Sequence, residues 1–127
     1  MMNTTRSLLR GYWSRGLMAA LLAAGTAIPV SAHHGWSAYD AKKTITVTAV
    51  VRNVQWRNPH AEAIIDHEGK AWTIVLAPIA RMQSRGLTAE MLKDGVSATV
   101  EGYPRSDGTP EMRLERITVS GKTVELR

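Results

Sequence analysis

The sequence predicts a mainly β protein with very little helix, and three observations support this fold class. Residues 44–51 alternate small polar with β-branched apolar side chains, which is the period of a half-buried strand. Further short runs of this kind recur along the chain, and turns that contain glycine separate several of them. Helical spacing is confined to a short stretch after Pro78.

The first half of the chain reads as a meander of three strands. The strand that starts at residue 44 continues through Val54 and Trp56 until Asn58-Pro59 interrupts it, because proline cannot donate to a sheet ladder. We expect a turn or a bulge at this point. A second strand over 61–66 and a third over 71–76 follow, joined by a glycine-containing turn.

A helical connection follows the third strand. Residues 79–83 are expected to form a short helix that Gly86 ends as a C-cap. Residues 88–93 are expected to form a second helical turn, with Thr88 as its N-cap and Gly95 as its end.

Strands resume at 96–103 and 112–119 around the turn at 106–108, and residues 121–127 are expected to add a short edge strand. This order matches a small five-stranded antiparallel barrel of the OB type, which has three strands, a helical connection between strands 3 and 4, and two more strands. The alternatives are another small antiparallel barrel or a sandwich with a helical excursion.

The first 32 residues resemble a secretory signal peptide. Arg6, Arg10 and Arg15 form a basic start, and the apolar run over 17–28 is shorter than the roughly 20 residues that a membrane-spanning helix needs. Small side chains precede a cleavage point after Ala32. We therefore expect a signal peptide over 1–32, an N-terminal arm over 33–43, an OB-like β-barrel domain over 44–127, and a periplasmic or secreted protein. The alternative is an uncleaved membrane anchor.

Composition limits the function classes. Without residues 1–32 the formal net charge falls from +5 to +2, a weak electrostatic basis for phosphate binding, and export also argues against a nucleic-acid partner. The remaining 95 residues suit one small domain. The sequence contains no cysteine, no phosphate-binding loop and no Gly-x-Ser-x-Gly motif, so we expect binding rather than catalysis. We also expect no membrane span after processing, because cleavage removes the apolar run over 17–28.

The predicted cleavage suggests a metal site. It would leave a free α-amine and two adjacent imidazoles, those of His33 and His34, at the start of the chain. Amine and imidazole nitrogens suit copper(II), and His60, re-aimed by the preceding proline, is the candidate third ligand. Asp40 is expected to orient a ligand histidine. One alternative is cleavage one residue earlier, which puts a histidine third from the amine and also favours copper(II) or nickel(II). Another is a disordered arm whose histidines bind nothing.

The tryptophans suggest a second interpretation. Trp36, Trp56 and Asn58 lie beside the candidate histidines in the sequence and are expected to contribute to the ligand face. Trp56 and Trp72 could also form a barrel face that binds a peptide, a glycan or a partner protein without metal, or could simply fill a core that lacks phenylalanine. His67 is expected to be a solvated turn residue.

Three segments carry a resemblance to a known family. They are the predicted mature start His33-His34-Gly35-Trp36-Ser37-Ala38-Tyr39-Asp40, the segment Val54-Gln55-Trp56-Arg57-Asn58-Pro59-His60, and Gly102-Tyr103-Pro104. Together they resemble the exported bacterial DUF6152 family, in which Ser-Phe is more frequent where this chain has Gly35-Trp36. The resemblance implies the compartment and the fold, but no activity.

The sequence therefore predicts a small periplasmic metal-binding protein for copper delivery or tolerance. The partner is then a metal ion, or an envelope protein in the alternative interpretation. A copper redox enzyme is a third hypothesis, for which no substrate platform is identifiable.

Overall fold

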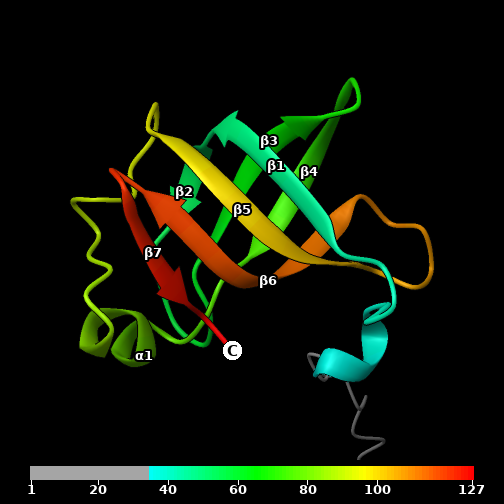
Figure 1. Cartoon of the computed structure of the whole chain (residues 1–127), viewed down its shortest axis with the longest axis horizontal. Helices are drawn as coiled ribbons and strands as arrows, with labels where there is room; N and C mark the ends of the chain where they lie inside the picture. Colours follow the sequence, from blue (N-terminus) through cyan, green and yellow to red (C-terminus); the bar gives the residue numbers. More distant parts are fainter. Residues whose placement is uncertain (1–34) are drawn as a thin grey trace, which may run out of the picture. The chain divides into compact units, whose positions relative to one another are not determined.

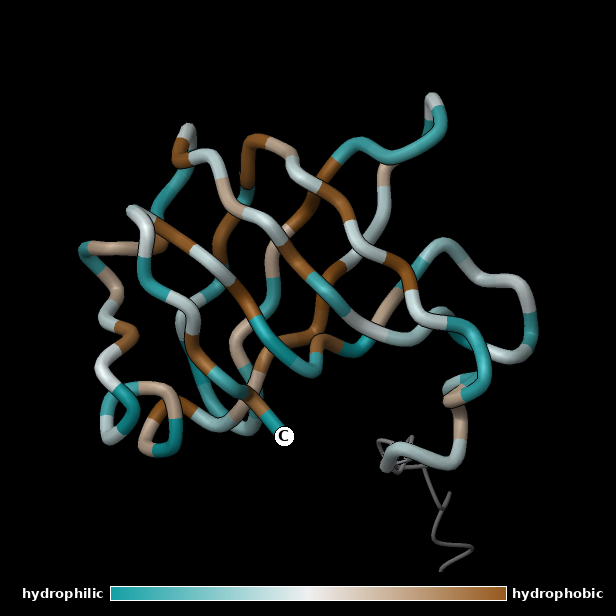
Figure 2. The backbone as a smooth tube through the Cα atoms, in the orientation of Figure 1, coloured by the Kyte–Doolittle hydropathy of each residue, from teal (hydrophilic) through white to brown (hydrophobic). Residues whose placement is uncertain are grey.

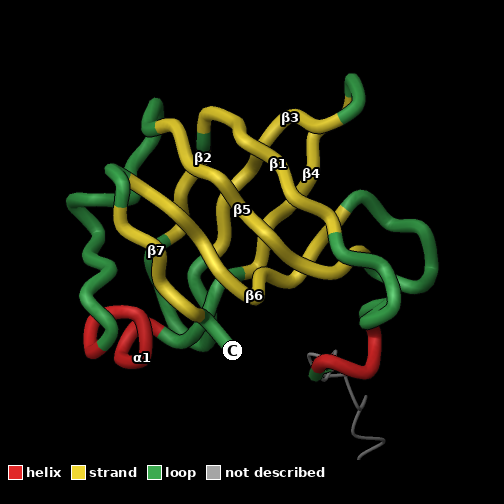
Figure 3. The backbone as a smooth tube through the Cα atoms, in the orientation of Figure 1, coloured by secondary structure: helices red, strands yellow, loops and turns green. Residues whose placement is uncertain are grey.

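A computed structural model describes residues 35–127 of the chain, and this part is mainly β, as predicted. His33, His34 and the predicted signal peptide lie outside the described residues. Figure 1 shows strongly curled strands with a small helical segment at one side, and Figure 3 shows how little of this part is helical. The elements are η1 (Trp36–Ala38), β1 (Ile45–Val50), β2 (Arg52–Gln55), β3 (Glu62–His67), β4 (Lys70–Val75), α1 (Ile79–Ser84), β5 (Ser97–Pro104), β6 (Glu111–Val119) and β7 (Lys122–Glu125).

The strands form one sheet in the order β1-β5-β6-β4-β3-β2, and β7 pairs with β6 off this path. Neighbouring strands are antiparallel except for β4 and β6, which are parallel. β1 and β2 lie at opposite ends of the strand order, yet only Val51 separates them in the chain. The sheet must therefore curl so that its two ends approach each other.

The concave side of the curled sheet holds the apolar core. Side chains along β5 and β6 are buried at alternate positions over most of their length, because successive residues of a strand point to opposite faces. Figure 2 shows this alternation of hydrophobic and hydrophilic residues along the strands. Met82 of α1 is fully buried and extends the same core.

The sequence predicts a five-stranded barrel, whereas the structure has seven strands in residues 35–127. One reason for the higher number is that the predicted first strand breaks at Val51 and forms both β1 and β2. The Val51 N–H donates to the Val96 carbonyl over 2.8 Å, and its carbonyl accepts from the Gly95 N–H over 2.8 Å. Val51 thus pairs with the loop before β5. The other reason is that the expected C-terminal edge strand forms as β7.

The helical connection is shorter than predicted. α1 ends where expected, because Gly86 adopts a positive φ of 83° and the Leu87 N–H returns to the Met82 carbonyl over 2.9 Å. Residues 88–93 form no regular helix but a single turn, in which the N–H groups of Met91 and Leu92 return to the Thr88 carbonyl over 3.2 and 3.3 Å. The pairing of Gly95 with Val51 requires the chain to turn into β5 directly after them.

Within residues 35–127, none of the helical segments has the length and apolar character needed to cross a membrane.

Gly102 is expected to be essential for the register of β5 and β6. A Cβ atom at this position would collide with the Arg113 carbonyl and lie 2.9 Å from the Leu114 Cα, at a register shift between the two strands. Gly102→Ala should therefore lower the free energy of unfolding by about 2 kcal/mol, measured by urea denaturation. Ser97→Ala, at an exposed position of the same strand, should change it by less than about 0.5 kcal/mol. Equal effects of the two substitutions would contradict this role.

Candidate functional site

The described part of the N-terminal arm is fixed to the start of the β5–β6 loop. The Asp40 N–H donates to the Pro104 carbonyl over 2.9 Å, and the Ser106 N–H donates to the Ala38 carbonyl over 3.0 Å. The buried Tyr39 hydroxyl donates to a Glu111 carboxylate oxygen over 2.5 Å. Burial and this hydrogen bond raise the pKa of Tyr39, so the phenol remains a donor at physiological pH.

Arg113 of β6 connects this arm to the turn between β2 and β3. Its guanidinium carbon lies 4.8 Å from the centroid of the Trp36 ring, which is cation–π distance. Its Nη2 lies 3.2 Å from the Nε2 of His60, which directly follows the cis peptide bond Asn58-Pro59. The arm and the histidine are therefore brought within one arginine side chain of each other.

The hydrogen bond defines the state of the His60 ring. A guanidinium has donors but no acceptor, so Nε2 of His60 must accept and carries the unprotonated lone pair. The proton of the neutral ring is then on Nδ1. This ring presents the form of Nε2 that can bind a metal ion.

The environment of Arg113 is unusual for an arginine. The guanidinium is partly buried, burial lowers its pKa, and its Nε is buried without a hydrogen-bond partner. Within residues 35–127 it forms no ion pair with a carboxylate. The contacts with Trp36 and His60 therefore contribute to holding this cation in place.

The C-terminal tail reaches the same place. Arg81 of α1 donates to the Leu126 carbonyl over 3.1 Å, and Arg85 donates to the Glu125 and Arg127 carbonyls over 2.7 and 2.9 Å. The guanidinium carbon of Arg127 lies 4.8 Å from the centroid of the Trp36 ring. Two guanidinium groups thus contact one indole.

The structure brings together all three sequence segments that carry the family resemblance. Trp36 comes from the arm, His60 from the second segment, and Tyr103 from the third, where its ring lies edge-on to Trp36 with 6.0 Å between centroids. Tyr103 also donates to a Glu115 carboxylate oxygen. We call the group of Trp36, His60, Tyr103, Arg113 and Arg127 the arm cluster.

The other predicted site residues lie around this cluster or away from it. The Asp40 carboxylate accepts from the Lys42 N–H and pairs with Lys43 over 3.5 Å. Trp56 packs against the core, and Asn58 is exposed beside the cis bond. Among residues 35–127, no group of three or more His, Cys, Asp or Glu side chains is placed to hold a metal ion.

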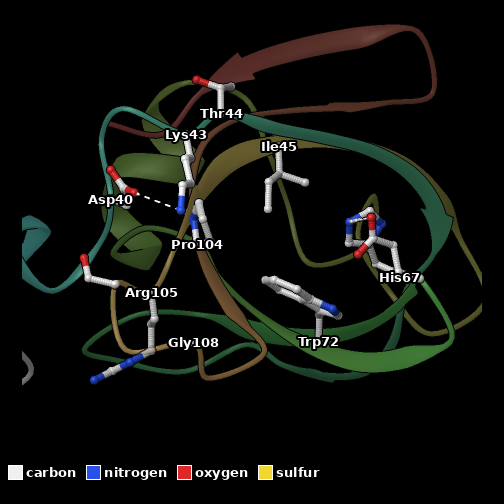
Figure 4. A pocket seen from close by; sticks show the side chains of 11 residues that line it. Asp40, Lys43, Thr44, Ile45, His67, Trp72, Pro104, Arg105 and Gly108 are labelled. Carbon is white, nitrogen blue, oxygen red and sulfur yellow. Dashed lines mark ion pairs between the residues drawn. The ribbon is translucent and has the colours of Figure 1, made fainter.

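A separate pocket lies at the other end of β3 and β4 (Figure 4). Trp72, His67 and Asp40 are among its lining residues, whereas Trp56 is not. The interpretation of His67 as a solvated turn residue was wrong. Its side chain is only 21% exposed and its ring lies edge-on to Trp72, with 5.5 Å between centroids.

Sequence reasoning missed Arg113 and Arg127. Arg113 stands between the buried residues Met112 and Leu114, and a charged residue at that strand position is ordinarily a solvated one. The sequence places Arg113 in a strand next to predicted core residues. It does not show which segment of the chain the Arg113 side chain will contact.

Comparisons with known proteins agree with the resemblance. The model of DUF6152, described as a family of unknown function, matches residues 20–113. A search of curated proteins finds no match for the chain.

The contact between Arg113 and Trp36 is expected to contribute measurably to stability. A double-mutant cycle of Arg113→Met and Trp36→Leu, followed by urea denaturation, should give a coupling free energy of about 0.5–2 kcal/mol. The pair Arg52→Met and Trp36→Leu is the control and should be additive, because Arg52 pairs with Asp66 instead. Additivity of the first pair would show that the contact does not hold the arm.

Proposed function

Because the chain belongs to the DUF6152 family, whose function is unknown, we propose its function from its own residues: it is a small exported protein that binds a copper-type ion. The ligands are the α-amine and imidazole of His33 together with the imidazole of His34 or His60. Its role is metal delivery or tolerance rather than catalysis. The protein works in the periplasm or outside the cell, after cleavage behind Ala32.

The observation that carries this proposal is the link from Trp36 through Arg113 to His60. One residue adds at most about 3.6 Å to an extended chain. Two residues therefore span at most about 7 Å of chain, and three residues span at most about 11 Å. This reach makes a shared site of the chain start and the His60 ring sterically possible.

The chemistry of the ligand set favours copper(II). An amine and two imidazoles are borderline nitrogen ligands, and copper(II) binds such ligands more strongly than the other common divalent ions. The neutral His60 ring already carries its lone pair on Nε2, so no proton has to leave that atom before it binds. A metal at Nε2 would take the place of the Arg113 donor.

We also propose that the curled sheet is of the OB type. If β1 and β2 count as one bent strand and β7 as an addition, the strand order becomes that of five strands in which the third and fifth are parallel. α1 then lies between the third and fourth strands, where the OB barrel carries its helix.

The proposal predicts that copper binding depends on the free α-amine of His33. Copper(II) is titrated into the processed protein and into the same protein with its α-amine acetylated. The acetylated form should bind at least about tenfold more weakly, because its first nitrogen no longer offers a lone pair to the metal. Equal affinity would exclude the amine-based site.

His60→Ala should also weaken copper binding, whereas the control His67→Ala should leave it unchanged, because His67 lies at the separate pocket. If only His67→Ala lost copper binding, the metal site would have to lie at the pocket beside Trp72 and not at His60.

A further inference from the structure

The pocket beside Trp72 has the volume of a small-molecule site and shares no residue with the arm cluster. Its volume is about 490 Å³. This falls in the range of about 300–1,000 Å³ that is typical of ligand pockets. Figure 4 shows Ile45 of β1 above and Trp72 of β4 below, with open space between the two side chains. A flat molecule could enter between these two apolar surfaces.

The charged side chains of the pocket balance one another. Asp40 and Glu68 contribute two carboxylates, and Lys43 and Arg105 contribute two cations. Lys43 pairs with Asp40 over 3.5 Å, and Arg105 pairs with Asp107 over 3.0 Å. An ionic ligand would therefore find no excess of opposite charge.

This balance suits a ligand with several hydroxyl groups. A hydroxyl donates one hydrogen bond and accepts others, so it can bond both to the cations and to the carboxylates of the rim. The rings of Trp72 and His67 and the side chain of Ile45 offer the apolar surface for the body of the same ligand.

We propose that this pocket binds a neutral saccharide. One face of a pyranose ring carries mostly C–H groups and packs on Trp72 opposite Ile45, while the hydroxyls at the ring edge bond to the charged rim. This site uses Trp72 without Trp56 and needs no metal.

Trp72 also provides an internal probe. Its Nε1 is buried and has no hydrogen-bond partner, and Figure 4 shows the ring nitrogen on the side of His67. Because His67 ends β3 beside the pocket and its ring contacts Trp72, a ligand that displaces this ring changes the surroundings of the Trp72 N–H. The indole N–H signal of Trp72 is therefore expected to report binding.

The test compares three sugars that share the pyranose ring and differ in charge. Glucose is neutral, glucosamine is cationic and glucuronate is anionic; maltose and N-acetylglucosamine extend the neutral set. Each is titrated into the processed protein, without added metal, while the indole N–H signals are followed by NMR. At least one neutral sugar should shift the Trp72 signal in a saturable way and bind at least as tightly as the charged pair.

Variants separate the pocket from other surfaces. Ile45→Ala should weaken binding of that sugar by about tenfold, and Lys43→Met should weaken it without unfolding the protein, since Lys43 is 74% exposed. Trp56→Leu is the control outside the pocket and should not change the affinity. The proposal is overturned if no neutral sugar shifts the Trp72 signal, if only a charged sugar does, or if Ile45→Ala and Lys43→Met bind as tightly as the unaltered protein. The sugar titrations contain no copper, so their outcome does not affect the metal proposal, which the copper titration tests separately.

Discussion

The side chain of Arg113 is the contact on which the arrangement of the arm cluster depends. Its guanidinium lies over the ring of Trp36, and its Nη2 donates to Nε2 of His60. Trp36 and His60 are 24 positions apart in the chain and come from different parts of the fold. Gly102 allows β5 to approach β6 at this height, because any larger residue would meet the Arg113 carbonyl. Backbone packing between two strands thus determines where a turn histidine and the arm meet.

The arm has a second role in the fold. Trp36 belongs to the arm cluster, whereas Asp40, four residues later, lines the pocket beside Trp72. Between them, Tyr39 is buried and bonded to Glu111. A segment that looks like a simple leader to the first strand therefore contributes to both candidate sites, and the Tyr39 anchor holds the two contributions apart.

Local patterns predicted most of the strands, because the alternation of polar and apolar residues with a period of two is visible within each segment alone. They also predicted α1 and its end at Gly86, where a left-handed residue is required. They failed at Val51, because a long-range backbone pair between Val51 and Gly95 overrides the local preference there. The break in the first strand was therefore not readable from alternation.

The candidate site was predictable only in part, for the same reason. The histidines and the proline before His60 are visible as residue types, but Arg113 acquires its role from the register that places it beside Tyr103 on β5. His67 likewise becomes a pocket residue through its contact with Trp72 on the neighbouring strand. Long-range strand pairing decides these neighbours.

Paramagnetic broadening by copper(II) tests the metal proposal most directly. One equivalent of the ion is added to the processed protein, and the NMR signals of the histidine rings and of the arginine Nε–H groups are compared. The account predicts that the His60 ring and the Arg113 Nε–H broaden first, with Trp36 close behind and His67 unaffected. Broadening centred on His67, or none in the arm cluster, would contradict it.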